Sequence, residues 1–88
     1  MSEQPEDEFV ENTLIQAIEN QIETGEPAAA KAVYNKLTLV GYEPEEALDL
    51  MAQVLAMEID DMLEADRPFD SQWYETALRG LPELPESR

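Results

Sequence analysis

Carboxylates are the main side chains through which this chain could carry out chemistry. Its 88 residues include 21 Asp and Glu but neither Cys nor His. The sequence therefore lacks the commonest general base, the usual thiol nucleophile and the usual ligands of zinc, copper and iron–sulfur clusters. It also shows no nucleophile beside a base, no Gly-rich phosphate loop and no carboxylate pair at a characteristic catalytic spacing. The sequence favours a non-enzymatic role, with no catalytic residue and no cofactor.

Three carboxylates have positions that could suit a hard metal ion. Glu11 lies early in the first expected helix, and Glu45 and Asp49 lie in the opening turns of the third. In an up-down-up bundle these helix starts lie at the same end, where the three side chains could converge. Carboxylate oxygens are the ligands that Mg, Ca and Mn prefer. The alternative, which the sequence favours, is that all three are solvated acids that stabilise helix starts.

The charge of the chain restricts its partners. Five Lys and Arg against 21 acids give a net charge of −16, which argues against binding nucleic acid or an anionic membrane. A charged partner should be basic, although an acidic surface can also serve solubility alone. The N-terminal sequence has no basic region followed by an apolar run, and no apolar stretch approaches the roughly 20 residues that cross a bilayer. We therefore expect a cytoplasmic protein.

Turn residues and apolar spacing divide the chain into four helical segments. Gly25 and Gly41 each end a segment with helical periodicity, while Pro27 and Pro44 each suit the first position of a helix. The predicted helices run from an Asp7 cap to residue 24, over 27–40, over 44–65, and from an Asp70 cap to residue 79, where Gly80 ends the last.

These segments predict an all-α fold, a small helical bundle of three main helices plus a short C-terminal fourth. Residues 1–88 form a single domain, with 1–6 and 82–88 expected to be flexible tails. The short connection at Gly25 and Glu26 predicts that the first two helices are antiparallel neighbours. A chain of this size is near the lower limit for a self-sufficient core and often adds a partner.

The third helix, within 43–66, is apolar on two sides. The side expected to face the core consists of Leu48, Met51, Ala52, Leu55, Ile59, Met62 and Leu63. The opposite stripe contains Leu50, Val54 and Met57, and the short fourth helix is expected to cover it poorly. A second copy of the chain could bury that stripe without leaving an exposed apolar patch. The sequence therefore predicts a homodimer with an apolar seam centred on Val54.

Acids also crowd the end of this third helix, where the helix dipole disfavours them. Asp60, Asp61 and Glu64 lie in its last turns, and only Arg67 offsets them locally. Acidic residues that reduce the stability of the helix suggest a function in binding. These three side chains are the predicted acidic patch, a surface for a basic partner.

Several short motifs resemble a bacterial domain-of-unknown-function family of short helical proteins. The similarity spans about 14–82 and rests on Glu19-Asn20-Gln21, on Gly-x-x-Pro-Glu-Glu-Ala at 41–47, and on Arg67-Pro68-Phe69-Asp70 followed by Tyr74 and Leu78. The resemblance implies a helical fold and no established activity. Family members often carry His on the first helix and early in the third, where this chain has Glu11, Ile15, Glu45 and Asp49. A His-based metal site is therefore not expected here.

Three classes of function follow from the sequence. The first is a protein–protein interaction or assembly module that binds a protein partner or itself. The second is an acidic decoy or regulator that occupies a basic protein surface. The third is a divalent-metal-binding protein that uses only carboxylates.

Overall fold

The computed structural model describes residues 5–85, with side chains described from residue 12 onward. Its helices are α1 (Pro5–Thr24), α2 (Ala28–Leu39), α3 (Pro44–Ala65) and α4 (Ser71–Arg79), and the described residues contain no strand. The predicted all-α fold is thus confirmed. Within the same residues, no helix combines the length and the apolar character needed to cross a membrane.

Local sequence chemistry explains both ends of α3. Glu43 caps its start, where the Glu43 backbone N–H donates to the Glu46 carboxylate at 3.1 Å in a capping box, and Pro44 follows as the first helical residue. The helix ends at Asp66, which has a left-handed φ of 55°. The Arg67 N–H then bonds the Met62 carbonyl at 3.2 Å. The predicted limits of this helix are confirmed.

The start of α4 also follows the prediction. The Asp70 carboxylate accepts a hydrogen bond from the Trp73 N–H at 3.0 Å, as an N-cap does. The rings of Phe69 and Tyr74, which flank this cap, meet edge to face with centroids 5.4 Å apart. The cap and this hydrophobic contact together fix the direction in which the chain enters α4.

The beginnings of α1 and α2 differ slightly from the prediction. Helix α1 starts at Pro5, so Asp7 lies inside the helix and is not its cap, and the helix includes residues 5 and 6 of the expected tail. Pro27 is the N-cap of α2, with extended backbone angles, rather than its first helical residue. Gly25 and Gly41 end their helices with φ of 75° and 113°, which glycine adopts without strain.

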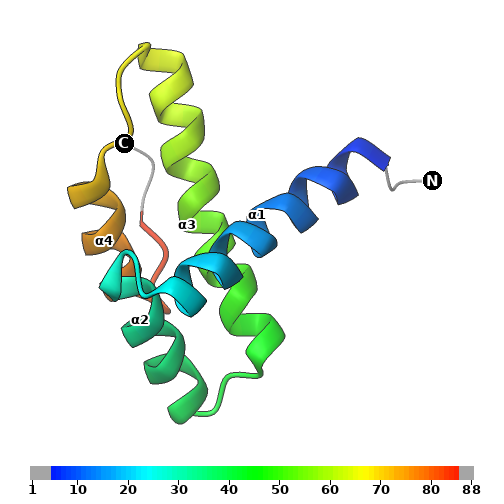
Figure 1. The fold of residues 1–88 in the computed structure, drawn as a ribbon, viewed down its shortest axis with the longest axis vertical. Helices are drawn as coiled ribbons and strands as arrows, with labels where there is room; N and C mark the ends of the chain where they lie inside the picture. Colours follow the sequence, from blue (N-terminus) through cyan, green and yellow to red (C-terminus); the bar gives the residue numbers. More distant parts are fainter. Residues whose placement is uncertain (1–4, 86–88) are drawn as a thin grey trace.

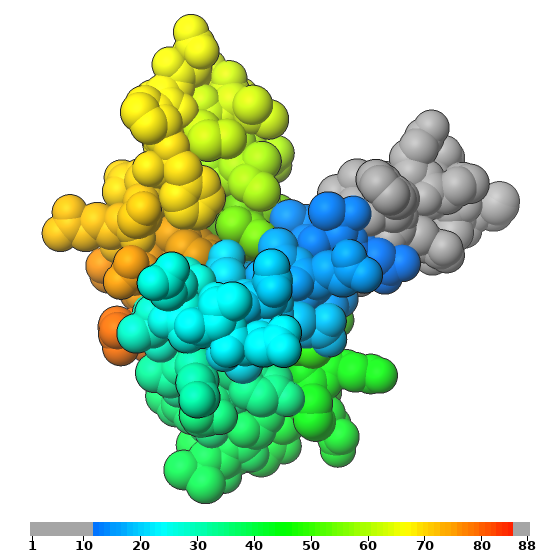
Figure 2. Space-filling view, viewed as in Figure 1, coloured from blue at the N-terminus to red at the C-terminus, as the bar shows by residue number. Residues whose placement is uncertain are grey.

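The arrangement of the helices differs from a simple up-down-up bundle. Helices α2 and α3 lie side by side and antiparallel, with α4 against both, whereas α1 runs across α2 and α3 at a steep angle (Figure 1). Figure 2 shows α1, in blue to cyan, lying over the teal surface of α2 and the green surface of α3. The predicted antiparallel pairing of the first two helices is wrong. The left-handed Gly25 and the extended Pro27 turn the chain sharply between them.

All four helices contribute to one core. Ile18 of α1 is fully buried, and so are Leu37 of α2, Met51 of α3 and Leu78 of α4. Leu81, in the turn after α4, joins the same cluster. The C-terminal segment therefore extends the cover that α4 gives to the core beyond the helix itself.

This cover overturns the predicted apolar seam. Val54 has an exposed fraction of 0%, and Leu50 and Met57 are half-buried, so the chain's own helices already cover that stripe. Val54 therefore has no surface to offer to a symmetric interface, while the predicted homodimer itself stays a prediction. By contrast Leu63, expected in the core, is 69% exposed, because the last turns of α3 extend beyond the other helices (Figure 1).

Candidate interaction groove

Two adjoining depressions lie where α1 crosses α3. One has a volume of about 180 Å³ and the other about 390 Å³, and Glu19 and Leu48 line both. We call the pair the α1–α3 groove. Four half-buried side chains that rest on the core form its apolar floor: Ile15, Ile22, Tyr34 and Leu48. The floor thus combines residues of α1, α2 and α3, which only the crossing of α1 brings together.

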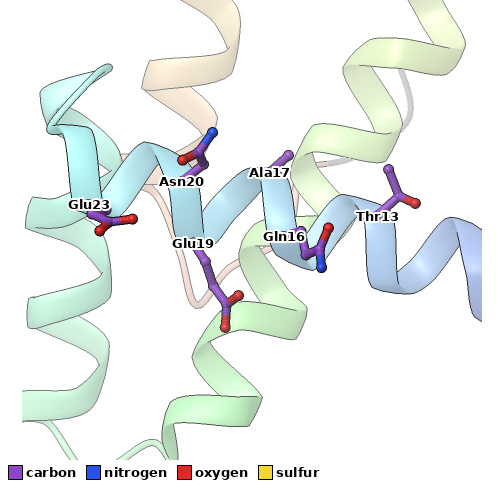
Figure 3. Close-up of a pocket in the computed structure, with 6 residues that line it drawn as sticks. All are labelled: Thr13, Gln16, Ala17, Glu19, Asn20 and Glu23. Carbon is purple, nitrogen blue, oxygen red and sulfur yellow. The ribbon is translucent and has the colours of Figure 1, made fainter.

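Carboxylates stand on both walls of the α1–α3 groove. Glu19 and Glu23 come from α1 and are four residues apart, so they lie on one face of that helix. Glu45 and Asp49 have the same spacing on α3. All four residues are exposed. Figure 3 shows the Glu19 side chain extending from α1 toward the N-terminal half of α3. The groove is therefore an apolar strip with a negative border on each side.

The structure brings together only part of the predicted metal-binding set. Glu45 and Asp49 share one wall of the groove, but the side chain of Glu11 lies outside the described residues. Because α1 crosses α3 instead of running parallel to it, the premise that both helices start at the same end of a bundle does not hold. Among the side chains that the structure describes, no group of three or more carboxylates is placed to hold a metal ion. The site that includes Glu11 stays a prediction.

A second hollow, of about 490 Å³, lies on the outer face of α1 (Figure 3). All the residues that line it belong to this one helix, and most are polar. Asn20 and Glu19 both line this hollow, and their side chains leave α1 in different directions (Figure 3). Because a single helix supplies every wall, this hollow is an exposed polar helix face and not an enclosed site. The six lining residues are Thr13, Gln16, Ala17, Glu19, Asn20 and Glu23.

The predicted acidic patch is divided by a structural ion pair. Asp61 accepts a 2.7 Å hydrogen bond from Arg67, so its charge is partly compensated within the chain. Asp60 and Glu64 are exposed. The same guanidinium also contacts Glu58, and its hydrogen bonds to Glu58 and Asp61 raise the pKa of Arg67 above its ordinary value. Asp61 therefore helps to hold the chain after α3 in place.

Sequence reasoning missed Glu58, the buried charged residue of this cluster. Its carboxylate has an exposed fraction of 0%, bonds Arg67 twice and accepts the Asp70 N–H at 2.7 Å. A signal was present, because Glu58 lies seven residues after Met51 and four after Val54, on an inward-facing stripe of α3. An acid on such a stripe needs a basic partner nearby, and Arg67 follows just after the helix end.

One polar contact joins α1 to α4 through the core. The Tyr74 hydroxyl donates a 2.7 Å hydrogen bond to the side-chain oxygen of Gln21. Tyr74 is 2% exposed, and this burial raises the pKa of its hydroxyl to about 12. Gln21 thus has a structural role in positioning α4, while Glu19, two residues earlier, faces the groove.

The chain matches no family model, no curated protein and no solved structure. The resemblance to the bacterial family of short helical proteins therefore stays a prediction.

Proposed function

We propose that this chain is a protein–protein interaction module that binds its partner in the α1–α3 groove. The observation that carries the proposal is the half-buried apolar floor, including Ile22 and Leu48, between two walls of exposed carboxylates. An apolar centre surrounded by a polar rim is the usual anatomy of a protein interface. The accessible floor supplies binding energy, and the rim selects the partner.

The shape of the groove favours a macromolecule over a small metabolite. Small-molecule sites enclose most of the surface of their ligand. Both depressions of the α1–α3 groove are open to solvent, and the described residues supply no cluster of metal ligands there. A groove of this kind contacts one face of a ligand and leaves the other face exposed. This suits a protein segment, because the segment remains attached to the rest of its own chain.

A different protein fits the groove better than a second copy of the chain. Pairing two grooves face to face would bring Glu19, Glu23, Glu45 and Asp49 of each copy against their counterparts. Such pairing opposes like charges in a chain whose net charge is already −16. We therefore propose a basic protein partner for this face. This proposal combines two of the predicted functions, the interaction module and the regulator that binds a basic protein surface.

Site-specific photo-crosslinking in the native host tests this proposal. A photoreactive amino acid replaces Glu23 in the groove, and the same amino acid replaces the exposed Gln72 on α4 as the matched control. We expect a discrete crosslinked protein from position 23 and not from position 72. We also propose a cytoplasmic location, which cell fractionation of the same sample tests.

Three results would contradict the proposal. These are no adduct at position 23, the same adducts at both positions, and an adduct that consists of two copies of the chain. The last result would establish self-association in place of a separate partner.

A further inference from the structure

We infer that the segment bound in the α1–α3 groove is a basic amphipathic helix, with a narrow apolar stripe flanked on both sides by Lys or Arg. This inference rests on the proposed function and names the chemistry of the partner. It depends on the length of the groove floor, on the spacing of the groove carboxylates and on the charge of the whole chain.

The floor has the length of two helical turns. Ile15 and Ile22 are seven residues apart on α1, which corresponds to about 10 Å along the helix axis. Leu48 lines both depressions and so lies between these two ends. A bound helix presents apolar side chains over the same distance when they occur at intervals of three and four residues. Two or three such anchors would cover the floor.

The carboxylates are spaced to meet cations on both edges of that helix. Glu19 and Glu23 are one turn apart on the α1 wall, and Glu45 and Asp49 are one turn apart on the α3 wall. Helix α1 contains neither Lys nor Arg. The long stems of Lys and Arg can lie along apolar surface while their charged ends reach the rim. A stripe with cations on only one edge would leave one wall unpaired.

The charge of the chain argues against the other occupants of an open groove. Nucleic acid and anionic membranes carry the same sign of charge as both walls, and the net charge of −16 adds to the repulsion. A divalent cation alone would leave the apolar floor exposed to water. A basic amphipathic helix satisfies the floor and both walls together.

Binding of a designed peptide probe to the full chain tests the inference. The probe has about 14 residues, or four helical turns, with Leu at every third or fourth position and Lys and Ala elsewhere. Its control has the same composition, with Leu scattered so that no stripe forms. We expect the amphipathic probe to bind about tenfold more tightly than the control at physiological salt, and to gain helicity on binding.

Two charge-matched double variants locate the binding site. Glu45→Gln with Asp49→Asn removes one Glu and one Asp from the groove wall, and Asp60→Asn with Glu64→Gln removes the same charges from the far end of α3. We expect the first pair to weaken probe binding about five- to tenfold and the second less than about twofold, because salt screens distant charges. Circular dichroism confirms that both variants are folded.

Leu48→Ala removes part of the floor, and Leu63→Ala is its exposed control on the same helix. We expect only Leu48→Ala to weaken binding. Equal binding of the two peptides, or equal effects of the two double variants, would overturn the inference and indicate nonspecific charge attraction.

The crosslinked partner from the native host separates the two proposals. A crosslinked segment that is neither basic nor helical would overturn the inference while the proposed function stands. Failure to crosslink any partner through the groove would overturn the proposed function, even if the synthetic probe binds.

Discussion

Glu58 and Arg67 form a bidentate ion pair at the junction between α3 and α4. The fully buried Glu58 carboxylate accepts hydrogen bonds from both terminal nitrogens of the Arg67 guanidinium, at 2.7 and 3.1 Å. It also accepts the backbone N–H of Asp70, the N-cap of α4, at 2.7 Å. One carboxylate thus ties α3 both to the segment that follows it and to the start of the next helix.

Glu58→Gln should destabilise the protein by about 3 kcal/mol, because it leaves buried donors incompletely paired and removes the charge opposite Arg67. Asp61→Asn is the matched control on the same helix. Asp61 is partly exposed, so its loss should cost less than about 1 kcal/mol. Urea unfolding measures both free energies. Small and equal effects would show that the burial of Glu58 adds nothing to the free energy of unfolding beyond what the exposed pair contributes.

Tyr74→Phe should change the stability of the protein at alkaline pH. Burial raises the pKa of Tyr74 to about 12, against about 10 when unfolded. The folded state therefore retains this proton where the unfolded state releases it. Its contribution to stability is full below pH 10 and falls, by up to about 1.4 kcal/mol per pH unit, as the pH rises toward 12.

In the Tyr74→Phe variant, the part of the alkaline loss of stability that Tyr74 causes should disappear. The substitution should also cost about 1 kcal/mol at neutral pH, because the hydrogen bond to Gln21 disappears. Urea unfolding at a series of pH values measures both effects. An unchanged alkaline decrease in Tyr74→Phe would assign the decrease to other groups.

Val54→Glu should unfold the protein and not yield a folded monomer. Val54 is completely buried, so the new carboxylate has no access to water and no basic partner in the core. Leu63→Glu adds the same charge to the same helix at a position that is 69% exposed, and should remain folded. Circular dichroism and sedimentation report folding and mass. A folded Val54→Glu protein would contradict the packing of α3.

Asp60→Asn with Glu64→Gln should leave stability unchanged or raise it by about 0.5 kcal/mol. Both residues are exposed near the C-terminal end of α3, where the helix dipole disfavours anions. Glu45→Gln with Glu46→Gln at the opposite end should destabilise the helix by a similar amount. Thermal unfolding at low salt measures both pairs. The same sign for both would exclude the helix dipole as the cause.

Millimolar Mg, Ca or Mn should change the melting temperature little beyond the effect of matched NaCl. A divalent site that uses Glu11, Glu45 and Asp49 would stabilise the folded state by mass action. Glu45→Gln is the diagnostic variant. An increase that this substitution removes would establish the carboxylate site, and an increase that survives it would indicate screening of the −16 charge.

Local sequence signals were sufficient to predict which segments are helical and where most of the helices end. Pro44 and the Asp70 cap start helices, and Gly25 and Gly41 end them, through hydrogen bonds and backbone angles that involve residues only a few positions away. The apolar repeats similarly predicted that helices form one core. These features are local, so they could be predicted without knowing how the helices meet.

Which surfaces those helices cover depends on contacts between segments that are distant in sequence. The direction of α1 across α3 is set by packing between distant segments, and it created the groove between Glu19 and Glu45. An apolar residue such as Val54 suits both a protein core and an interface between chains. Its position in the helical repeat alone could therefore not distinguish the two. The ion pair of Glu58 depends on where the chain after α3 returns. Helical periodicity identifies the face of a helix on which a side chain lies, but the element that packs against that face is fixed by contacts distant in sequence.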